Sequence, residues 1–329
     1  MPSSCSRTCS GPISAPGTSR TPSSNTRSGS VDTVRASAEA GPPSAAPPKG
    51  APGARWRDLR KRVLSAALLA PAALLCVWLG AEAWTALMAA AATVLAWEWV
   101  RLCGYSTRRL PGIGVPIAVL AAGTLAVEEQ WLTSIALLCG GAVAVSAISG
   151  PSPTRGGLAG NWLGFGVLYI GLATISLVHL RGDASAGRLN VLFLFFTVWA
   201  SDIGAYAAGR LLGGPKLAPS VSPNKTWTGA AGGLFSAVAV GAAAAYVMAA
   251  AGTPAPTGRV LLVASGIGLL AQAGDFFESW IKRRFDVKDS SSLIPGHGGL
   301  LDRLDGVLAA APAAAVLGVL LGPGEALWR

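Results

Sequence analysis

The chain has 329 residues, of which 51% are hydrophobic and only 13% are charged, and its formal net charge is +10. This balance excludes an ordinary soluble enzyme and is typical of a protein that crosses a membrane several times. The positive charge would suit nucleic acid, but no basic patch is interleaved with stacking aromatic residues, so we expect no nucleic-acid partner. The five cysteines contain no C-x-x-C pair, which disfavours structural zinc and a disulfide framework.

The first segment of the chain, residues 1–52, is dominated by Ser, Pro, Ala, Gly and Thr. Such a segment cannot bury enough apolar surface to offset its conformational entropy, so we expect a disordered N-terminal tail. It also lacks the apolar stretch of a cleavable signal peptide. We therefore expect residues 53–329 to form one transmembrane domain whose first span is an uncleaved insertion signal.

Nine apolar stretches follow, each of about the length that crosses a hydrocarbon core of ~30 Å. The predicted spans are 63–80, 83–100, 112–127, 131–149, 162–180, 189–210, 229–251, 259–281 and 303–322. The third is short and interrupted by Pro and Gly. The pattern predicts an all-α, polytopic membrane protein with about nine transmembrane helices.

The distribution of basic residues predicts the orientation of these spans. With a cytoplasmic N-terminus, all but four of the 26 Lys and Arg residues fall on the cytoplasmic side. Lys and Arg are retained on that side during insertion. We therefore expect a multi-pass protein of the cell (inner or plasma) membrane, with the polar connection between the last two spans on the cytoplasmic side.

That connection belongs to a polar run, DFFESWIKRRFDVKDSSSLIPGHGGLLDRLDG, which covers residues 275–306. Five of its carboxylates, four of its cations and a glycine-flanked histidine make up the inventory of a site: Asp275, Glu278, Asp289, Asp302, Asp305, Lys282, Arg283, Lys288, Arg303 and His297. Carboxylates bind Mg²⁺ and cations bind phosphate. A single charged group could merely snorkel to the interface, but carboxylates at membrane level are costly, so several together indicate a functional site.

The spacing of the acidic residues predicts how they are presented. Asp275, Glu278 and Ser279 share one face of a helix at i, i+3 and i+4, and Asp302 and Asp305 open the last span. Glycines in the connection would let the backbone approach a ligand closely. The sequence therefore predicts a pocket with carboxylates for metal and cations for phosphate. Asp202, within the sixth span, is expected to face the same pocket, although a buried, hydrogen-bonded carboxyl is the alternative reading.

Residues 279–305 closely resemble the signature of the phosphatidate cytidylyltransferase (CDP-diacylglycerol synthase) family. Its fixed positions are met by Ser279, Lys282, Arg283, Lys288, Asp289, Pro295, His297, Gly298, Gly299, Asp302, Arg303 and Asp305. Three upstream segments also look like family elements: Gly274-Asp275-x-x-Glu278-Ser279, Ser201-Asp202-x-x-Ala205-Tyr206 and Ser222-Pro223-Asn224-Lys225-Thr226. One position departs from the family pattern, because Thr228 stands where an acidic residue commonly precedes the glycine.

The resemblance implies a Mg²⁺-dependent transfer of the cytidylyl group from CTP to phosphatidate, giving CDP-diacylglycerol and pyrophosphate in phospholipid biosynthesis. It suggests catalytic roles for Asp275, Asp302, Lys282, Arg283 and His297. It suggests substrate binding by Lys225, Ser222, Lys288, Arg303, Asp289, Gly298 and Gly299, and Mg²⁺ binding by Asp275, Asp302, Asp305 and Asp202. A turn and a helix start would explain Ser222 and Thr226 equally well, and loop-shaping hydrogen bonds are the alternative for His297. The implied partners are CTP, phosphatidate and the lipid bilayer, and a homodimer is left open.

Two rival functions can be weighed from the sequence. Asp302-x-x-Asp305-Gly306 resembles the opening of the CDP-alcohol phosphotransferase motif, but no aspartate follows Asp305, so we reject that reading. A cation-coupled transporter would also use intramembrane carboxylates, but the paired half-repeats that it predicts are not found. The group Trp97-Glu98-Trp99, at the end of the second span, is expected to belong to an interfacial aromatic belt without a function.

Overall fold

The computed structural model describes residues 70–150, 159–253, 255–291, 293, 298–322 and 325–327. Eight helices in these residues are long and apolar enough to cross a membrane: α3 (Ala81–Leu102), α4 (Leu110–Val127), α5 (Trp131–Ile148), α6 (Ala159–Gly182), α7 (Gly187–Leu211), α8 (Trp227–Ala250), α9 (Thr257–Arg284) and α10 (Leu301–Leu321). An antiparallel hairpin of β1 (Lys216–Ala218) and β2 (Ser222–Thr226) joins α7 to α8. The predicted class, an all-α polytopic membrane protein, is confirmed.

Eight of the nine predicted spans correspond to these helices. The short third span is α4, which starts with a proline in its first turn and continues through Pro116. The first predicted span begins outside the described residues, and its described part is a shorter apolar helix, Ala70–Leu79. The predicted disordered tail also lies outside the described residues.

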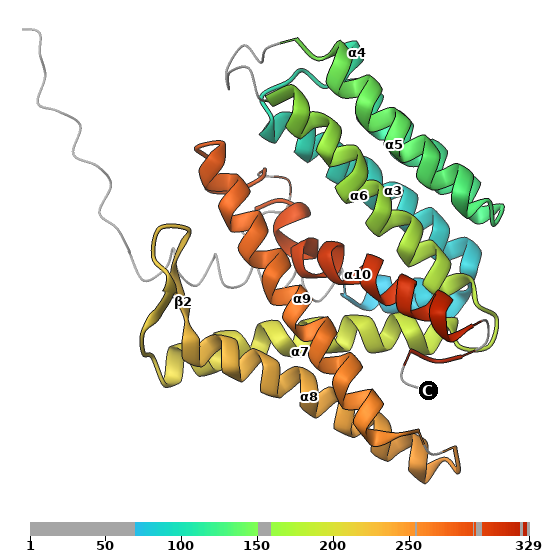
Figure 1. Cartoon of the computed structure of the whole chain (residues 1–329), viewed down its shortest axis with the longest axis vertical. Helices are drawn as coiled ribbons and strands as arrows, with labels where there is room; N and C mark the ends of the chain where they lie inside the picture. The colour runs from blue at the N-terminus through green and yellow to red at the C-terminus, as the bar shows by residue number, and fades with distance from the viewer. Residues whose placement is uncertain are drawn as a thin grey trace, which may run out of the picture. The chain divides into compact units, whose positions relative to one another are not determined.

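The spanning helices pack as two groups that α10 connects. Helices α3, α4, α5 and α6 lie side by side, whereas α7 pairs with α8, and α9 packs on α8 (Figure 1). Helix α10 contacts α9 and α7 of one group and α6 and α3 of the other. The start of α10 is therefore where polar residues from both groups can meet.

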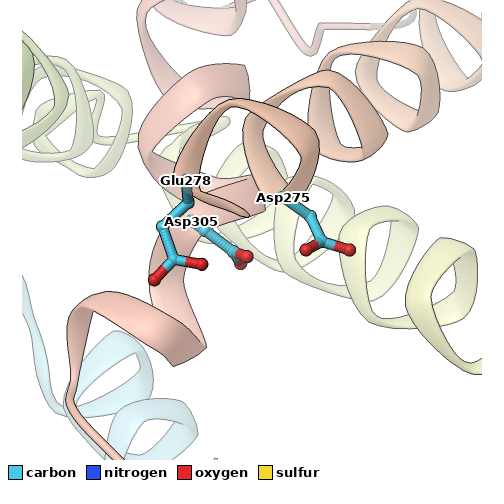
Figure 2. A group of neighbouring side chains, drawn as sticks. All are labelled: Asp275, Glu278 and Asp305. Atoms are coloured by element: carbon cyan, nitrogen blue, oxygen red, sulfur yellow. The ribbon is translucent and has the colours of Figure 1, made fainter. Parts of the chain in front are cut away.

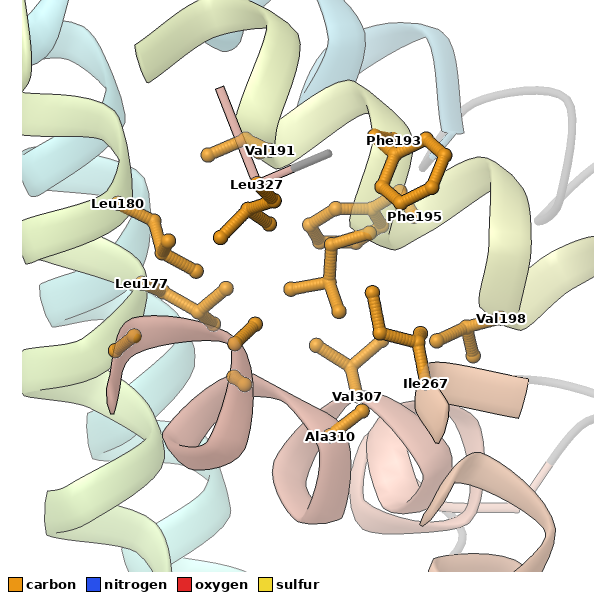
Figure 3. Packing of buried hydrophobic residues seen from close by; sticks show 14 of the residues in the cluster. Leu177, Leu180, Val191, Phe193, Phe195, Val198, Ile267, Val307, Ala310 and Leu327 are labelled. Carbon is orange, nitrogen blue, oxygen red and sulfur yellow. The ribbon is translucent and has the colours of Figure 1, made fainter. Parts of the chain in front are cut away.

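The buried apolar residues form two clusters, and each of them draws residues from both helix groups. One cluster lies among α6, α7, α9 and α10, and Figure 3 shows Phe195, Ile267 and Val307 within it. The other lies among α3 to α6 and includes Leu308 of α10. Lipid tails are as apolar as the side chains, so packing within these clusters depends on close fit between helices rather than on exclusion of water.

Two tryptophans of α3 are buried and bonded rather than interfacial. Trp99 is 1% exposed and its Nε1–H donates to the carbonyl of Trp162 at 2.8 Å. Trp84 donates in the same way to the carbonyl of Leu177 at 2.9 Å. A buried indole N–H needs an acceptor, and both find one on α6. The aromatic-belt interpretation is therefore wrong for Trp99.

Small residues set the close crossing of α9 and α10. A Cβ atom on Gly274 would lie 2.4 Å from the carbonyl oxygen of Asp305 and 2.7 Å from the Cβ of Ala309. On the opposite helix, a Cβ on Gly306 would lie 3.3 Å from the Cβ of Ala271. Glycines next to two acidic residues thus let the two helix backbones touch, as small residues do in membrane helix pairs.

We expect Gly274→Ala to destabilise the protein, because the added methyl group must push α10 away from α9. Overpacking of this kind costs about 1–3 kcal/mol, which should lower Tm in detergent by roughly 2 °C or more. Gly266→Ala is the matched control on the same helix, because a Cβ there meets no atom within 4 Å. Equal Tm values for the two variants would contradict the close crossing.

Candidate active site

A cavity of about 1110 Å³ lies among α7, the hairpin, α8, α9 and the start of α10. Its charged lining includes Asp202, Lys225, Asp275, Asp302, Arg303, Asp305 and Arg210. All but Arg210 were predicted as site residues, and they come from four separate segments of the chain. The structure therefore brings most of the motif-borne charges to one place.

Three carboxylates form the acidic centre of this region. Asp275, Glu278 and Asp305 each place one carboxylate oxygen within 4.8 Å of the other two. Figure 2 shows that Asp275 and Glu278 project from α9 and that Asp305 meets them from α10. We call these three residues the carboxylate trio.

The trio has the donor atoms that a hard divalent cation such as Mg²⁺ prefers. Glu278 and Asp305 are buried, whereas Asp275 is partly exposed to the cavity. Oε1 of Glu278 is buried and has no hydrogen-bond partner among the described residues. A buried carboxylate oxygen without a donor is costly, so this atom fits a cation ligand.

Lys282 lies behind the trio and joins it to α10. Its Nζ is 2.9 Å from Oε2 of Glu278 and 2.9 Å from Oδ1 of Asp302. The side chains of these two carboxylates are only 4% and 7% exposed. Asp302 also accepts hydrogen bonds from the backbone N–H groups of Gly299 at 2.8 Å and Ser290 at 3.2 Å. Asp302 is thus occupied in holding the start of α10, while Glu278 supplies the third carboxylate of the trio.

Besides Arg210, two cations face the cavity from opposite elements. Lys225, on β2, places Nζ 2.8 Å from Oδ2 of Asp275 and 5.3 Å from the centre of the Phe276 ring. Arg303 is exposed on the first turn of α10. Arg283 reaches the hairpin instead, where its Nε–H donates to the carbonyl of Val221 at 3.4 Å. The two facing cations could bind phosphate groups beside the trio.

The segment around Thr226 sets the position of Lys225. Thr226 is the N-cap of α8, and its Oγ1 accepts the Gly229 N–H at 3.1 Å. Thr228 Oγ1 lies 3.0 Å from Thr226 Oγ1 and donates to the carbonyl of Gly213. Thr228, which departs from the resembled pattern, therefore closes the base of the hairpin with a neutral hydrogen bond.

The remaining predicted residues lie elsewhere. Ser222 pairs with Ala218 at the other end of β2, away from the cavity lining. Lys288 and Asp289 are exposed in the connection between α9 and α10. Gly298 has φ +85°, and Gly299 is buried beside Asp302. His297 lies outside the described residues.

Sequence reasoning left three contributors out of its list of site residues. Glu278 was recognised as a carboxylate on the Asp275 face but was not predicted as a metal ligand, although its i+3 spacing pointed to that role. Gln272 lies three residues before Asp275 on the same helix. Its side-chain amide donates hydrogen bonds to Ser201 Oγ at 3.3 Å and to the Ala230 carbonyl at 3.2 Å, which connect α9 with α7 and α8. Glu98 of α3 is fully buried, and no motif pointed to it.

Comparison with known proteins identifies the family of this chain. The sequence profile of the Cytidylyltransferase family matches residues 60–321. The chain belongs to this family. The matched region contains the hairpin, the carboxylate trio and both facing cations.

Three relatives, each named phosphatidate cytidylyltransferase, align with this chain over nearly their full length. The protein of Brucella abortus biovar 1 (strain 9-941) is 36% identical over 271 residues, which is 82% of this chain and 97% of the relative. The Haemophilus influenzae protein is 33% identical over 282 residues, covering 77% and 96%. The Bacillus subtilis protein is 31% identical over 269 residues, covering 78% and 96%.

We expect Lys282→Met to be strongly destabilising, because it leaves Glu278 and Asp302 buried without their cation. Removing one partner of a buried ion pair costs about 3–5 kcal/mol. The double variant Lys282→Met/Asp302→Asn should recover part of this loss, because it removes one uncompensated charge.

Thermal unfolding in detergent checks this expectation, with Arg284→Met as the exposed control at the end of the same helix. A Tm for Lys282→Met equal to that of the control would contradict the bridging role of Lys282.

Proposed function

We propose that this protein transfers the cytidylyl group of CTP to phosphatidate, giving CDP-diacylglycerol and pyrophosphate. Family membership supports the activity, and one feature of the structure supports the substrate pair. A second cavity of about 480 Å³, lined by apolar residues of α3, α6, α7 and α10, shares Asp202 and Arg303 with the polar cavity. An acyl chain and a water-soluble triphosphate could therefore approach one junction from different sides.

The lining of the second cavity suits a lipid. Its residues include Trp84, Met88, Phe195, Trp199 and Val307, and Asp202 and Arg303 are its only charged members among the described residues. An acyl chain that enters this cavity would exchange contacts with bilayer lipid for contacts with equally apolar side chains, so the fit of the cavity to the chain decides binding. In this proposal, Arg303 binds the lipid phosphate where the two cavities meet, and the chain extends along α3 and α10.

The reaction does not require a strong general base. A phosphate oxygen of phosphatidate is already largely ionised near neutral pH, because its second pKa is about 6. This oxygen forms a bond to the α-phosphorus of CTP. The bond from that phosphorus to the bridging oxygen breaks, and pyrophosphate leaves with the electron pair. The obstacle is repulsion between two anions, which positioned cations reduce.

The described residues divide between these tasks. Lys225 and Arg303 bind and orient phosphate groups, Asp275 with Glu278 and Asp305 would hold Mg²⁺, and Lys282 keeps Glu278 in place. When bound, Mg²⁺ would neutralise charge on the triphosphate. Asp202, at the junction, is a further candidate ligand. Arg283, Lys288, Asp289, Ser222, His297, Gly298 and Gly299 stay predicted contributors to substrate binding or catalysis.

We expect Asp275→Asn to reduce turnover by at least ~10², which corresponds to about 2.7 kcal/mol of transition-state stabilisation. The substitution keeps the shape of the side chain but removes the charge from the exposed member of the trio. Radiolabelled CTP and purified protein in phosphatidate micelles provide the measurement, with the Mg²⁺ concentration varied.

Asp286→Asn is the matched control for this experiment. Asp286 is exposed after α9 and has φ +57°, a conformation that asparagine also adopts readily. Turnover should change less than threefold. Near-normal activity of Asp275→Asn at limiting Mg²⁺ would overturn the proposed metal site.

We also propose that the cavity opens to the cytoplasm, where CTP is available and where the basic residues concentrate. A cysteine at the exposed Arg284, in a cysteine-free background, should react with an impermeant maleimide only in inverted vesicles. A cysteine at the exposed Thr253, between α8 and α9, should react only in intact cells or right-side-out vesicles. Reversed labelling would contradict this orientation. The homodimer left open by the sequence stays a prediction, and crosslinking in membranes can test it.

A further inference from the structure

Glu98 is a fully buried carboxylate on α3, far in sequence from the signature that it contacts. Its exposure is 0%. Oε1 accepts hydrogen bonds from Ser291 Oγ at 2.6 Å and from the Leu300 N–H at 2.9 Å, and Oε2 accepts the Leu301 N–H at 2.7 Å. Two donors from the segment between α9 and α10 and one from the first residue of α10 thus converge on one side chain from another part of the fold.

Two of these bonds cap α10 from outside its own sequence. The first N–H groups of a helix have no partner within the helix and carry partial positive charge. The N-cap residue Leu300 provides no side-chain cap. Glu98 supplies the missing acceptor, and its negative charge lies at the favourable end of the helix dipole.

The neighbouring glycine is explained by the same contact. A Cβ on Gly299 would lie 1.9 Å from Ser290 Oγ, 2.6 Å from Oε1 of Glu98 and 2.8 Å from Oε2 of Glu98. A larger residue would therefore displace both the Ser290 hydroxyl and the Glu98 carboxylate. The glycine lets the backbone lie against these two side chains together.

A continuous set of contacts leads from this cap to the carboxylate trio. The Gly299 N–H donates to Oδ2 of Asp302 at 2.8 Å, and Oδ1 of Asp302 binds Lys282. Lys282 in turn binds Glu278. Glu98 contacts the start of α10, and the position of this helix start determines where Asp302 binds Lys282. The position of Lys282 in turn determines where it binds Glu278.

We propose that Glu98 is a positioning residue for catalysis: it clamps Ser291 and the start of α10 so that Asp302, Lys282 and the trio keep their geometry. The proposal rests on the cytidylyltransferase activity proposed above. It assigns Glu98 no contact with substrate, so its loss should change turnover rather than substrate affinity.

The test compares Glu98→Gln, Glu98→Asp and Glu82→Gln in purified full-length protein. The glutamine amide would place an N–H₂ group against a backbone N–H donor. We expect kcat to fall at least tenfold in Glu98→Gln, while KM for phosphatidate and CTP stays within threefold. Glu98→Asp should recover part of kcat because it restores a carboxylate. Glu82, exposed in the first turn of the same helix, is the control and should be unaffected.

Hydrogen–deuterium exchange gives a readout that does not depend on activity. The amides of Leu300 and Leu301 should exchange at least tenfold faster in Glu98→Gln, whereas amides in the middle of α8 should be unchanged. Unchanged exchange at Leu300 and Leu301 would overturn the clamp. Faster exchange with normal kcat would reduce Glu98 to a purely structural residue and would also overturn the proposal.

Failure of the proposed function can be distinguished from failure of the proposal about Glu98, and a second variant is available if Glu98→Gln does not fold. If wild-type protein makes no CDP-diacylglycerol, the proposed function fails, and the exchange experiment still reports on the clamp. If Glu98→Gln does not accumulate, Ser291→Ala replaces it, because this variant removes one of the three donors. It should then lower kcat two- to fivefold at constant KM, and an unchanged kcat in both Ser291→Ala and Glu98→Asp would refute the proposal.

Discussion

The burial of several carboxylates at the crossing of α9 and α10 is the constraint on which the site depends. A buried carboxylate must receive a cation or hydrogen-bond donors. Asp302 receives Lys282 and backbone N–H groups, Glu278 shares the same lysine, and Asp275 receives Lys225. Gly274 permits this arrangement because it lets the two helices approach until their acidic residues face one another. Loss of that close approach would separate Asp305 from Asp275 and Glu278 and would break the ion pair between Lys282 and Asp302.

Elements from outside the crossing complete the site. The hairpin between α7 and α8 brings Lys225 over the cavity, and Thr226 and Thr228 fix its base through hydrogen bonds rather than charge. Helix α3 brings Glu98 to the start of α10 from the other helix group. Both helix groups therefore contribute to one polar region, and the shared junction at Arg303 connects that region with the apolar cavity. This connection is what a reaction between a lipid and a nucleotide requires.

The sequence predicted the spans well because long apolar runs are a direct consequence of the hydrocarbon thickness. It also predicted that Asp275 and Asp305 would converge, since helical spacing and polarity at the two helix ends pointed there. It did not predict Glu98, because a lone glutamate beside two tryptophans is indistinguishable in sequence from an interfacial residue. It predicted Asp302 as a metal ligand, which stays a prediction, but it could not predict that Lys282 and backbone N–H groups also bind the oxygens of Asp302. Such contacts join residues far apart in the chain, which local patterns cannot report.

The balance of charge around the trio favours the divalent cation proposed for it. The ion pairs around the trio join three carboxylates to two lysines, Lys225 and Lys282. With the neighbouring Asp305 there are four carboxylates: Asp275, Glu278, Asp302 and Asp305. In formal charges these six groups carry an excess of two negative charges. Asp202, Arg210 and Arg303 also line the cavity, and when they are counted the excess is one negative charge. The cations of this region therefore do not cancel its carboxylates. Mg²⁺ bound to the trio would reverse the sign of this net charge, and a net positive site attracts the phosphates of a nucleotide.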